Sequence, residues 1–232
     1  MENQLNRQYL RELFRQCSGR CRTFMHDKTD KHVKDDAILF RHDVDDNLDN
    51  SVNLSIMQMG YDIEATYFIL DTAPYFNPSD KEMWKKIRRI QSNGHEIGWH
   101  NNAITTWIKT GRRKPLKEHV RDAVQPFLDN GINIYGSASH GDRLCYQFGY
   151  INYELFQGYM GERVGTAIDF AKPTIEIEKV NPNDFSLHYE TYHIPHDLYF
   201  SEPGGKWSAN GEPRIEKDKR IQVLIHPQWW AL

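Results

Sequence analysis

The amino-acid sequence predicts an α/β fold built on a parallel β-sheet or barrel. Segments of strand composition alternate with segments of helical periodicity over the first 140 residues or so. Such alternation is typical of successive βα units, whose strands run parallel. In addition, polar side chains follow several of these strands, at the end where parallel α/β folds bind their ligands.

The composition indicates a folded chain that needs no disulfide framework. The chain has 232 residues, and 12% of them are aromatic, unlike the aromatic-poor composition of disordered chains. Lys and Arg number 29 against 32 Asp and Glu, a net charge of −3, which lacks the basic excess that nucleic acid or anionic lipid requires. Three cysteines cannot close a disulfide framework, so we expect free thiols in a reducing compartment.

The sequence also predicts a cytoplasmic protein of one domain. The N-terminal segment MENQLNRQYLRELFRQC mixes charges throughout, so it does not resemble a secretory signal. The longest clean apolar stretches, such as residues 37–40, have the length of a strand, so we expect no membrane insertion. No linker divides the chain, and we therefore expect a single domain over residues 1–232, with residues 1–36 as a helical lead-in.

The first elements are defined by apolar spacing and by helix-ending glycines. Residues 3–16 place their apolar side chains on one face and predict an amphipathic helix. A buried strand over residues 37–44 precedes a helix over residues 48–59 that stops at Gly60. A second strand follows at residues 65–70.

The next helix is expected to open with a capping box formed by Ser79 and Glu82 and to stop at Gly94. A third strand over residues 95–100 comes directly after it. Pro115 opens a further helix, which runs to Gly131 and leads into a fourth strand-like segment around residues 132–137.

Beyond Tyr150 the alternation loosens, but strand composition recurs. Four further segments carry it, and the last belongs to a buried strand over residues 220–226. The four are residues 174–180, 190–194, 197–200 and 221–225.

The first strand ends in a polar run, residues 41–46. Because side chains alternate along a strand, Arg41, Asp43 and Asp45 share one face. Two carboxylates on one face repel and need a cation, a shared proton or Arg41 between them, which favours a divalent metal beside a base. A solvated surface turn is the alternative, and it is favoured for Asp46 and Asp49 because such residues cap helices.

Three histidines also lie at predicted strand ends. His100 ends the third strand and is the metal-ligand candidate, whereas His95 begins that strand and is interpreted as structural. His140 follows the fourth strand, where a ligand and a locally hydrogen-bonded loop residue are equally consistent with the sequence. His226 follows the last strand and can act as a general acid, with Trp229 and Trp230 beside it either to stack on a sugar or to fill the end of the barrel.

These motifs together resemble the polysaccharide deacetylase family, also called carbohydrate esterase family 4 or the NodB-homology domain. The resemblance rests on Arg-His-Asp-Val-Asp at 41–45, Gly-His-Glu-Ile-Gly-Trp-His at 94–100 and Leu-Ile-His-Pro at 224–227. It covers residues 37–230. Residues 139–141, 201–207 and 226–230 resemble more narrowly a divergent branch among O-antigen and surface-polysaccharide gene products, including WbmS-like proteins.

The resemblance implies a distorted (β/α)₇ barrel and a catalytic divalent metal, usually zinc. By position, Asp43 would be the general base, Asp45 and His100 metal ligands, and His226 the general acid. The family's second metal histidine is replaced here by Ile104, and its Arg-x-Pro-Tyr segment is missing. We therefore hypothesise that His140 supplies the third ligand and that Arg41 tunes the base. The donor set would also suit iron, cobalt or nickel.

The activity that this resemblance implies is removal of an N-acetyl or other acyl group from an amino sugar during O-antigen-type polysaccharide synthesis. The substrate would be an acylated amino sugar, carried on a nucleotide or a lipid. Two alternatives compete with this reading: a catalytically degenerate barrel that binds carbohydrate, and a metal-dependent hydrolase of another non-peptide C–N bond.

Overall fold

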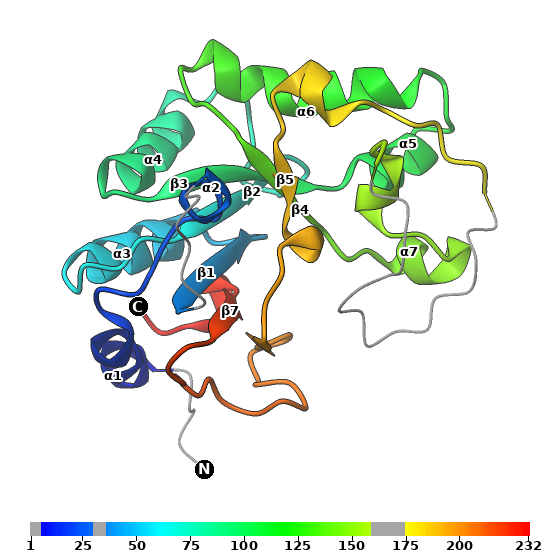
Figure 1. Cartoon of the computed structure of the whole chain (residues 1–232). Coiled ribbons are helices and arrows are strands. Elements are labelled where there is room, and N and C mark those ends of the chain that lie inside the picture. The colour runs from blue at the N-terminus through cyan, green and yellow to red at the C-terminus, as the bar shows by residue number, and fades with distance from the viewer. Residues whose placement is uncertain (1–5, 30–35, 159–174) are drawn as a thin grey trace. The chain divides into compact units, whose positions relative to one another are not determined.

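The computed structural model describes residues 6–29, 36–158 and 175–232 (Figure 1). Seven strands form a β-sheet in the order β5-β4-β3-β2-β1-β7-β6. β1 pairs in parallel with β2 and β7, β4 pairs in parallel with β3 and β5, and β6 pairs in parallel with β7. The predicted α/β fold with seven parallel strands, as in a distorted (β/α)₇ barrel, is confirmed. The strands are β1 (Ala37–Val44), β2 (Thr66–Leu70), β3 (Glu96–Asn101), β4 (Gly136–Ser139), β5 (Tyr189–Glu190), β6 (Leu198–Ser201) and β7 (Arg220–Ile225).

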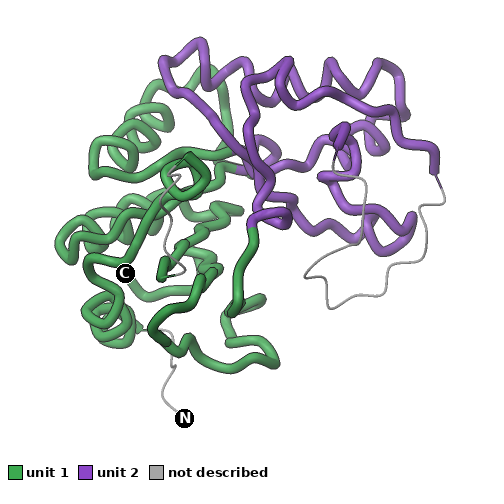
Figure 2. The backbone as a smooth tube through the Cα atoms, in the orientation of Figure 1, with its two compact units in different colours: residues 1–69, 73–98, 195–232 green, residues 70–72, 99–194 purple. Residues whose placement is uncertain are grey.

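The chain divides into two compact units, coloured separately in Figure 2. Unit 1 comprises Met1–Ile69, Ala73–Gly98 and Pro195–Leu232, and unit 2 comprises Leu70–Thr72 and Trp99–Ile194. The chain passes between the units inside β2 and β3. The expectation of a single domain stays a prediction.

In unit 1, helices lie around β1. Capping side chains determine where these helices begin. The Asn6 side chain accepts a hydrogen bond from the backbone N–H of Tyr9 at 3.0 Å, and helix α1 begins at the next residue after Asn6. Phe14 of α1 meets Phe40 of β1 edge to face, with ring centroids 5.5 Å apart, so α1 packs on β1. The helices of unit 1 are α1 (Arg7–Cys17), α2 (Phe24–Thr29), α3 (Leu48–Met59), α4 (Lys81–Ser92) and the short 3₁₀ helix η4 (Pro227–Trp229).

The expected capping box at Ser79 is wrong. Asp80 is the N-cap of α4, and its carboxylate accepts a hydrogen bond from the backbone N–H of Glu82 at 2.9 Å. Aspartate caps a helix as well as serine does, and its charge also suits the positive end of the helix dipole. The cap therefore lies one residue later than the sequence pattern predicts.

A buried polar network lies between α3 and the strands of unit 1. The Tyr67 hydroxyl donates to the Gln58 side-chain carbonyl at 2.6 Å, and Nε2 of His42 lies 3.2 Å from the same oxygen. His95 places Nε2 3.0 Å from the backbone carbonyl of Ser55. These hydrogen bonds offset the burial of the Tyr67 hydroxyl and of the two histidine Nε2 atoms, which is how polar side chains are tolerated in a core.

Unit 2 contains β4, β5 and the remaining helices. α6 begins after Pro115, so the proline occupies the N-cap position and not the first helical position. α5 was not expected, because its sequence, AITTWIK, is short and rich in β-branched residues. The helices of unit 2 are α5 (Ala103–Lys109), α6 (Leu116–Asp129), α7 (Arg143–Phe148), and the 3₁₀ helices η1 (Asn152–Leu155), η2 (Pro182–Phe185) and η3 (Thr191–His193).

Two strand predictions in unit 2 need correction. β4 begins at Gly136 and not near residue 132, although Ile132 and Ile134 are buried. Residues 175–179 form no strand, and Val180 makes only an isolated parallel bridge with Phe156; residue 174 lies outside the described residues. Ile132 and Ile134 are buried outside any strand, whereas Ile175 and Ile177 are only partly buried, so apolar alternation alone does not establish a strand in either segment. Across the described ranges, no helix combines the length and apolar character needed to cross a bilayer.

Candidate functional site

Arg41 and Asp43 form a buried ion pair on β1 in unit 1. Nε of Arg41 lies 2.8 Å from one carboxylate oxygen of Asp43, and a terminal guanidinium nitrogen lies 2.7 Å from the other. Each residue is only 2% exposed. The two-residue spacing on a strand puts both side chains on one face, which explains the bidentate geometry.

Asp45 follows the end of β1 and is partly buried. One of its carboxylate oxygens lies 3.3 Å from the side-chain nitrogen of Gln228 and 3.9 Å from Nε2 of His226. Asp46 and Asp49 differ, because both are exposed and Asp49 pairs with Lys86 at 2.6 Å. Within unit 1, therefore, Asp43, Asp45 and His226 belong to one neighbourhood, and Asp46 and Asp49 do not.

His226 is held by the buried carboxylate of Glu202, which the sequence did not mark as a site residue. Nδ1 of His226 lies 3.2 Å from Glu202, which also accepts hydrogen bonds from the His226 backbone N–H and from the Trp230 indole N–H. Glu202 has no exposed surface. A carboxylate immediately after a strand-like segment, within the 201–207 stretch, was the available signal for this role.

The pKa of His226 is raised above its usual value. Burial acts to lower it, but the hydrogen bond with Glu202 and the charges of Asp43, Glu202 and Asp45 outweigh burial. His226 therefore keeps its proton to higher pH than an exposed histidine. This is the property that a general acid working near neutral pH needs.

In unit 2, the rings of His100 and His140 meet edge to face, with their centroids 4.9 Å apart. His100 is 2% exposed, and its Nδ1 donates to the backbone carbonyl of Ala138 at 2.8 Å. In the neutral ring, Nε2 of His100 then carries a lone pair, and this atom lies 3.2 Å from Nδ1 of His140. His140 is fixed in turn by its backbone N–H, which donates to the Asn101 carbonyl at 2.9 Å.

Asn152, which the sequence does not mark as a site residue, makes hydrogen bonds to the backbone around His140. Its side-chain oxygen accepts from the backbone N–H groups of Ile104 and Thr105, and its nitrogen donates to the His140 carbonyl at 2.9 Å. Ile104 is fully buried in α5. Its hydrocarbon side chain has no atom that could bind a metal. Nothing in the sequence around Asn152 signals this role, since Ile104, Thr105 and His140 lie at least 12 residues away along the chain.

A second missed residue, Glu190, supports the end of β4. It has no exposed surface, and its carboxylate accepts from the Ser137 hydroxyl and from the Ser139 backbone N–H. The expected strand over residues 190–194 is confined to β5, after which η3 begins. Glu190 thus fixes the strand that precedes His140.

The remaining predicted residues are divided between core and surface. His95 is buried in the polar network of unit 1, and Trp230 is buried beside Glu202, whereas Trp229 is 46% exposed. Trp99 is buried and donates its indole N–H to Asp71 at 2.8 Å. Burial raises the pKa of Asp71 to about 6, against the opposing effect of this hydrogen bond.

Each unit, taken by itself, contains side chains of the candidate site. In unit 1, two hydrogen bonds from Arg41 hold the Asp43 carboxylate, and the pKa of His226 is raised. Unit 2 holds two imidazoles whose ring nitrogens approach each other, a donor pair that suits a divalent ion such as zinc, iron, cobalt or nickel.

Comparison with known proteins gives little sequence support and a distant structural likeness. No protein-family model and no curated protein matches the chain. Among solved structures, the chain is similar to the chitin deacetylase from the fungal pathogen Colletotrichum lindemuthianum, with a TM-score of 0.25 and 16% sequence identity. The match covers 48% of this chain and 60% of that protein, less than two thirds of its length.

Proposed function

We propose that this chain is a metal-dependent hydrolase that removes an N-acetyl or other acyl group from an amino sugar. The observation that carries the proposal is the pair of imidazoles in unit 2, His100 and His140, whose ring nitrogens lie 3.2 Å apart. Two such donors at the ends of neighbouring parallel strands are typical of a metal site in an α/β enzyme.

Asp45 is proposed to bind the same ion as the two histidines. Asp45, His100 and His140 each offer one ligand atom of a kind that binds divalent metals. The proposal requires that Asp45 of unit 1 meets the two histidines of unit 2 around one ion. Zinc fits two imidazoles and a carboxylate, and iron, cobalt and nickel fit them too.

Asp43 is proposed as the general base. A bound divalent ion would supply Lewis-acid chemistry, polarising an amide carbonyl and acidifying water. Asp43 accepts the proton of the attacking water, and Arg41 keeps its carboxylate oriented through two hydrogen bonds. Burial of both side chains makes this orientation rigid.

His226 is proposed as the general acid. Its Nδ1 is engaged by Glu202, so Nε2 is the atom that would deliver a proton to the departing amine. Its raised pKa supports this role, because the protonated ring persists to higher pH. The base and the acid thus come from β1 and from the residue after β7, strands that pair in the sheet.

The substrate is proposed to be an acylated amino sugar, linked to a nucleotide or a lipid, in O-antigen-type polysaccharide synthesis. We place the reaction in the cytoplasm, where such activated precursors are made. The support for this assignment is the resemblance of the 41–45, 94–100 and 224–227 motifs and of the 201–207 and 226–230 stretches.

The metal site is tested by elemental mass spectrometry of the purified protein. Wild-type protein should hold about one equivalent of metal after reconstitution, and Asp45→Ala, His100→Ala and His140→Ala should lose it. The matched control is His188→Ala, because His188 is exposed and lies outside the proposed ligand set. Circular dichroism spectra establish that each variant is folded.

The outcomes separate the competing readings. Full metal occupancy in folded His140→Ala would remove His140 from the ligand set. Absence of metal in the wild type, even with added zinc, cobalt or iron, would replace the hydrolase by a carbohydrate-binding barrel. Bound metal with release of a product other than acetate, identified by nuclear magnetic resonance, would indicate hydrolysis of another C–N bond.

A further inference from the structure

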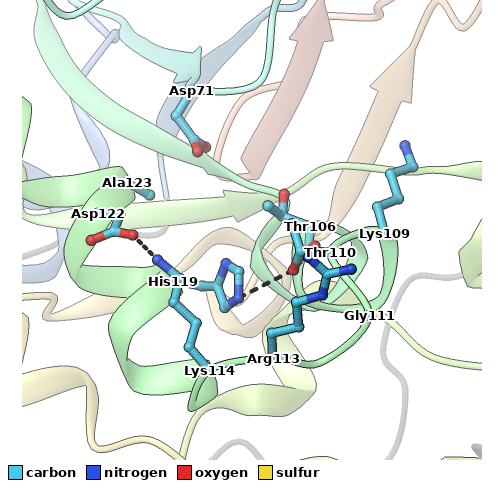
Figure 3. Close-up of a pocket in the computed structure, with 10 residues that line it drawn as sticks. All are labelled: Asp71, Thr106, Lys109, Thr110, Gly111, Arg113, Lys114, His119, Asp122 and Ala123. Carbon is cyan, nitrogen blue, oxygen red and sulfur yellow. Dashed lines mark hydrogen bonds and ion pairs between the residues drawn. The ribbon is translucent and has the colours of Figure 1, made fainter.

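Unit 2 contains a pocket that is lined by none of the proposed catalytic or metal-binding residues. Its cavity volume is about 650 Å³, within the range of small-molecule sites, and every lining residue belongs to unit 2 (Figure 3). Helices α5 and α6 and the loop between them form most of the wall, and Asp71 closes another side.

Hydrogen-bond acceptors gather in one part of this pocket. The carboxylate of Asp71 points toward the other lining residues (Figure 3), and the Trp99 indole occupies only one of its two oxygens at 2.8 Å. The hydroxyls of Thr106 and Thr110 donate to backbone carbonyls of their own helix. Their oxygens therefore face a ligand mainly as acceptors, and they suit a ligand rich in hydroxyl groups.

Arg113 supplies a positive charge that is not neutralised by a neighbour. Lys109 pairs with Asp142 at 2.8 Å, and Lys114 pairs with Asp122, the contact drawn at the left of Figure 3. Across residues 6–29, 36–158 and 175–232, no carboxylate pairs with Arg113.

The backbone before Arg113 explains why this side chain reaches the pocket. Gly111 and Arg112 both have positive φ, at 72° and 57°, so the chain reverses sharply there. Arg112 turns away, with its guanidinium 5.0 Å from the centre of the Trp107 ring. Arg113 is thereby left to line the pocket.

We propose that this pocket binds a phosphorylated sugar, with the phosphate on Arg113 and the sugar hydroxyls on Asp71 and the two threonines. Guanidinium groups recognise phosphate through paired hydrogen bonds, and Arg113 is the lining cation whose charge is not already engaged by a carboxylate, since Lys109 and Lys114 are paired with Asp142 and Asp122. The inference rests on the proposed function for the identity of the sugar, since it makes the substrate of the hydrolase an activated precursor and not a neutral polymer. The phosphate site itself needs neither metal nor turnover.

Isothermal titration calorimetry in the presence of a chelator tests the phosphate site separately from catalysis. The probes are N-acetylglucosamine 1-phosphate, the same sugar without phosphate, and uridine diphosphate N-acetylglucosamine. We expect the two phosphorylated probes to bind at least tenfold more tightly than the neutral sugar. Whichever phosphorylated probe binds more tightly shows whether the site prefers a sugar phosphate or a nucleotide sugar.

Two variants assign the effect to Arg113. Arg113→Ala should weaken the phosphorylated probes at least tenfold and leave the neutral sugar unchanged, and Arg113→Lys should recover part of the affinity. Arg121→Ala is the matched control, because Arg121 is exposed on α6 and does not line the pocket. Equal binding of phosphorylated and neutral sugar, or equal loss in Arg113→Ala and Arg121→Ala, would overturn the proposal.

Asp45→Ala keeps the two proposals distinguishable. If this variant loses metal and still binds the phosphorylated probes as the wild type does, the phosphate site stands independently of the hydrolase. If the wild type holds metal but binds no phosphorylated probe, the hydrolase proposal survives and the phosphate site is refuted.

Discussion

The buried carboxylate of Glu202 lies 3.2 Å from Nδ1 of His226 and also accepts the backbone N–H of that histidine. The same side chain thus fixes both the ring and the main chain of the residue after β7. With Nδ1 held in this way, Nε2 is the ring atom directed toward Asp45, at 3.9 Å. A histidine so restrained has one proton-transfer atom and one orientation.

Replacing Glu202 by glutamine should lower the pKa of His226, since the charge that favours the imidazolium is removed while the shape is kept. Nuclear magnetic resonance titration of the histidine ring protons measures this directly. If His226 is the general acid, the alkaline limb of the kcat/KM profile should move to lower pH as well. Exposed Glu176→Gln serves as the control, and an unchanged His226 titration in Glu202→Gln would contradict the assignment.

Arg41→Gln should destabilise the fold by about 3–5 kcal/mol, because it leaves a buried carboxylate without its bidentate partner. Urea unfolding followed by fluorescence gives the free energy of unfolding. The double variant Arg41→Gln/Asp43→Asn should recover part of the loss, since the buried charge is then removed with its partner. An additive double variant would show that the two side chains are not coupled. In Arg41→Gln, an unchanged pH–rate profile would also end the hypothesis that Arg41 tunes Asp43.

The buried network around His42 predicts acid sensitivity. Burial lowers the pKa of His42 to about 3, and it lowers the pKa of His95 as well. Between the unfolded value near 6.5 and the folded value, the unfolded chain binds more protons. The free energy of unfolding should therefore fall as pH falls through this window, by about 1.4 kcal/mol per pH unit for His42 alone.

Unfolding measured by urea at several pH values tests this dependence. His42→Gln should flatten it, because glutamine takes up no proton in this range. His188→Gln, at an exposed histidine, should keep the wild-type slope. A wild-type slope retained in His42→Gln would show that other groups cause the acid sensitivity.

Gly136→Ala should destabilise the protein by about 1–3 kcal/mol, the usual cost of overpacking a core. A Cβ at this position would overlap the ring of Tyr189, which lies opposite Gly136 in the β4–β5 register. Thermal unfolding compares it with Gly141→Ala, where no heavy atom lies within 4 Å of the added carbon. Equal effects at both glycines would refute the packing argument.

Local signals in the sequence were sufficient for the first strands and helices and for the Arg41–Asp43 arrangement. The predicted bounds of β1 and α3 match the structure residue for residue, since apolar periodicity and capping residues act over a few positions. The alternation of a strand also placed Arg41 and Asp43 on one face, and the structure shows them paired. Both features depend only on near neighbours in the chain.

The tertiary structure decided which distant side chains support the candidate site. Glu202 lies 24 residues from His226, Asn152 lies 12 residues from His140, and Glu190 lies 53 residues from Ser137. Glu202 carries one local signal, its place directly after a strand-like segment, and no local pattern marks Asn152 or Glu190, because their roles arise from burial that distant parts of the chain create. β4 begins at Gly136, later than the sequence predicts, and this too depends on a distant partner. Gly136 pairs with Tyr189 of β5. The sequence by itself determined the early strands and helices and their polar ends, and folding determined the partners that hold those polar ends in place.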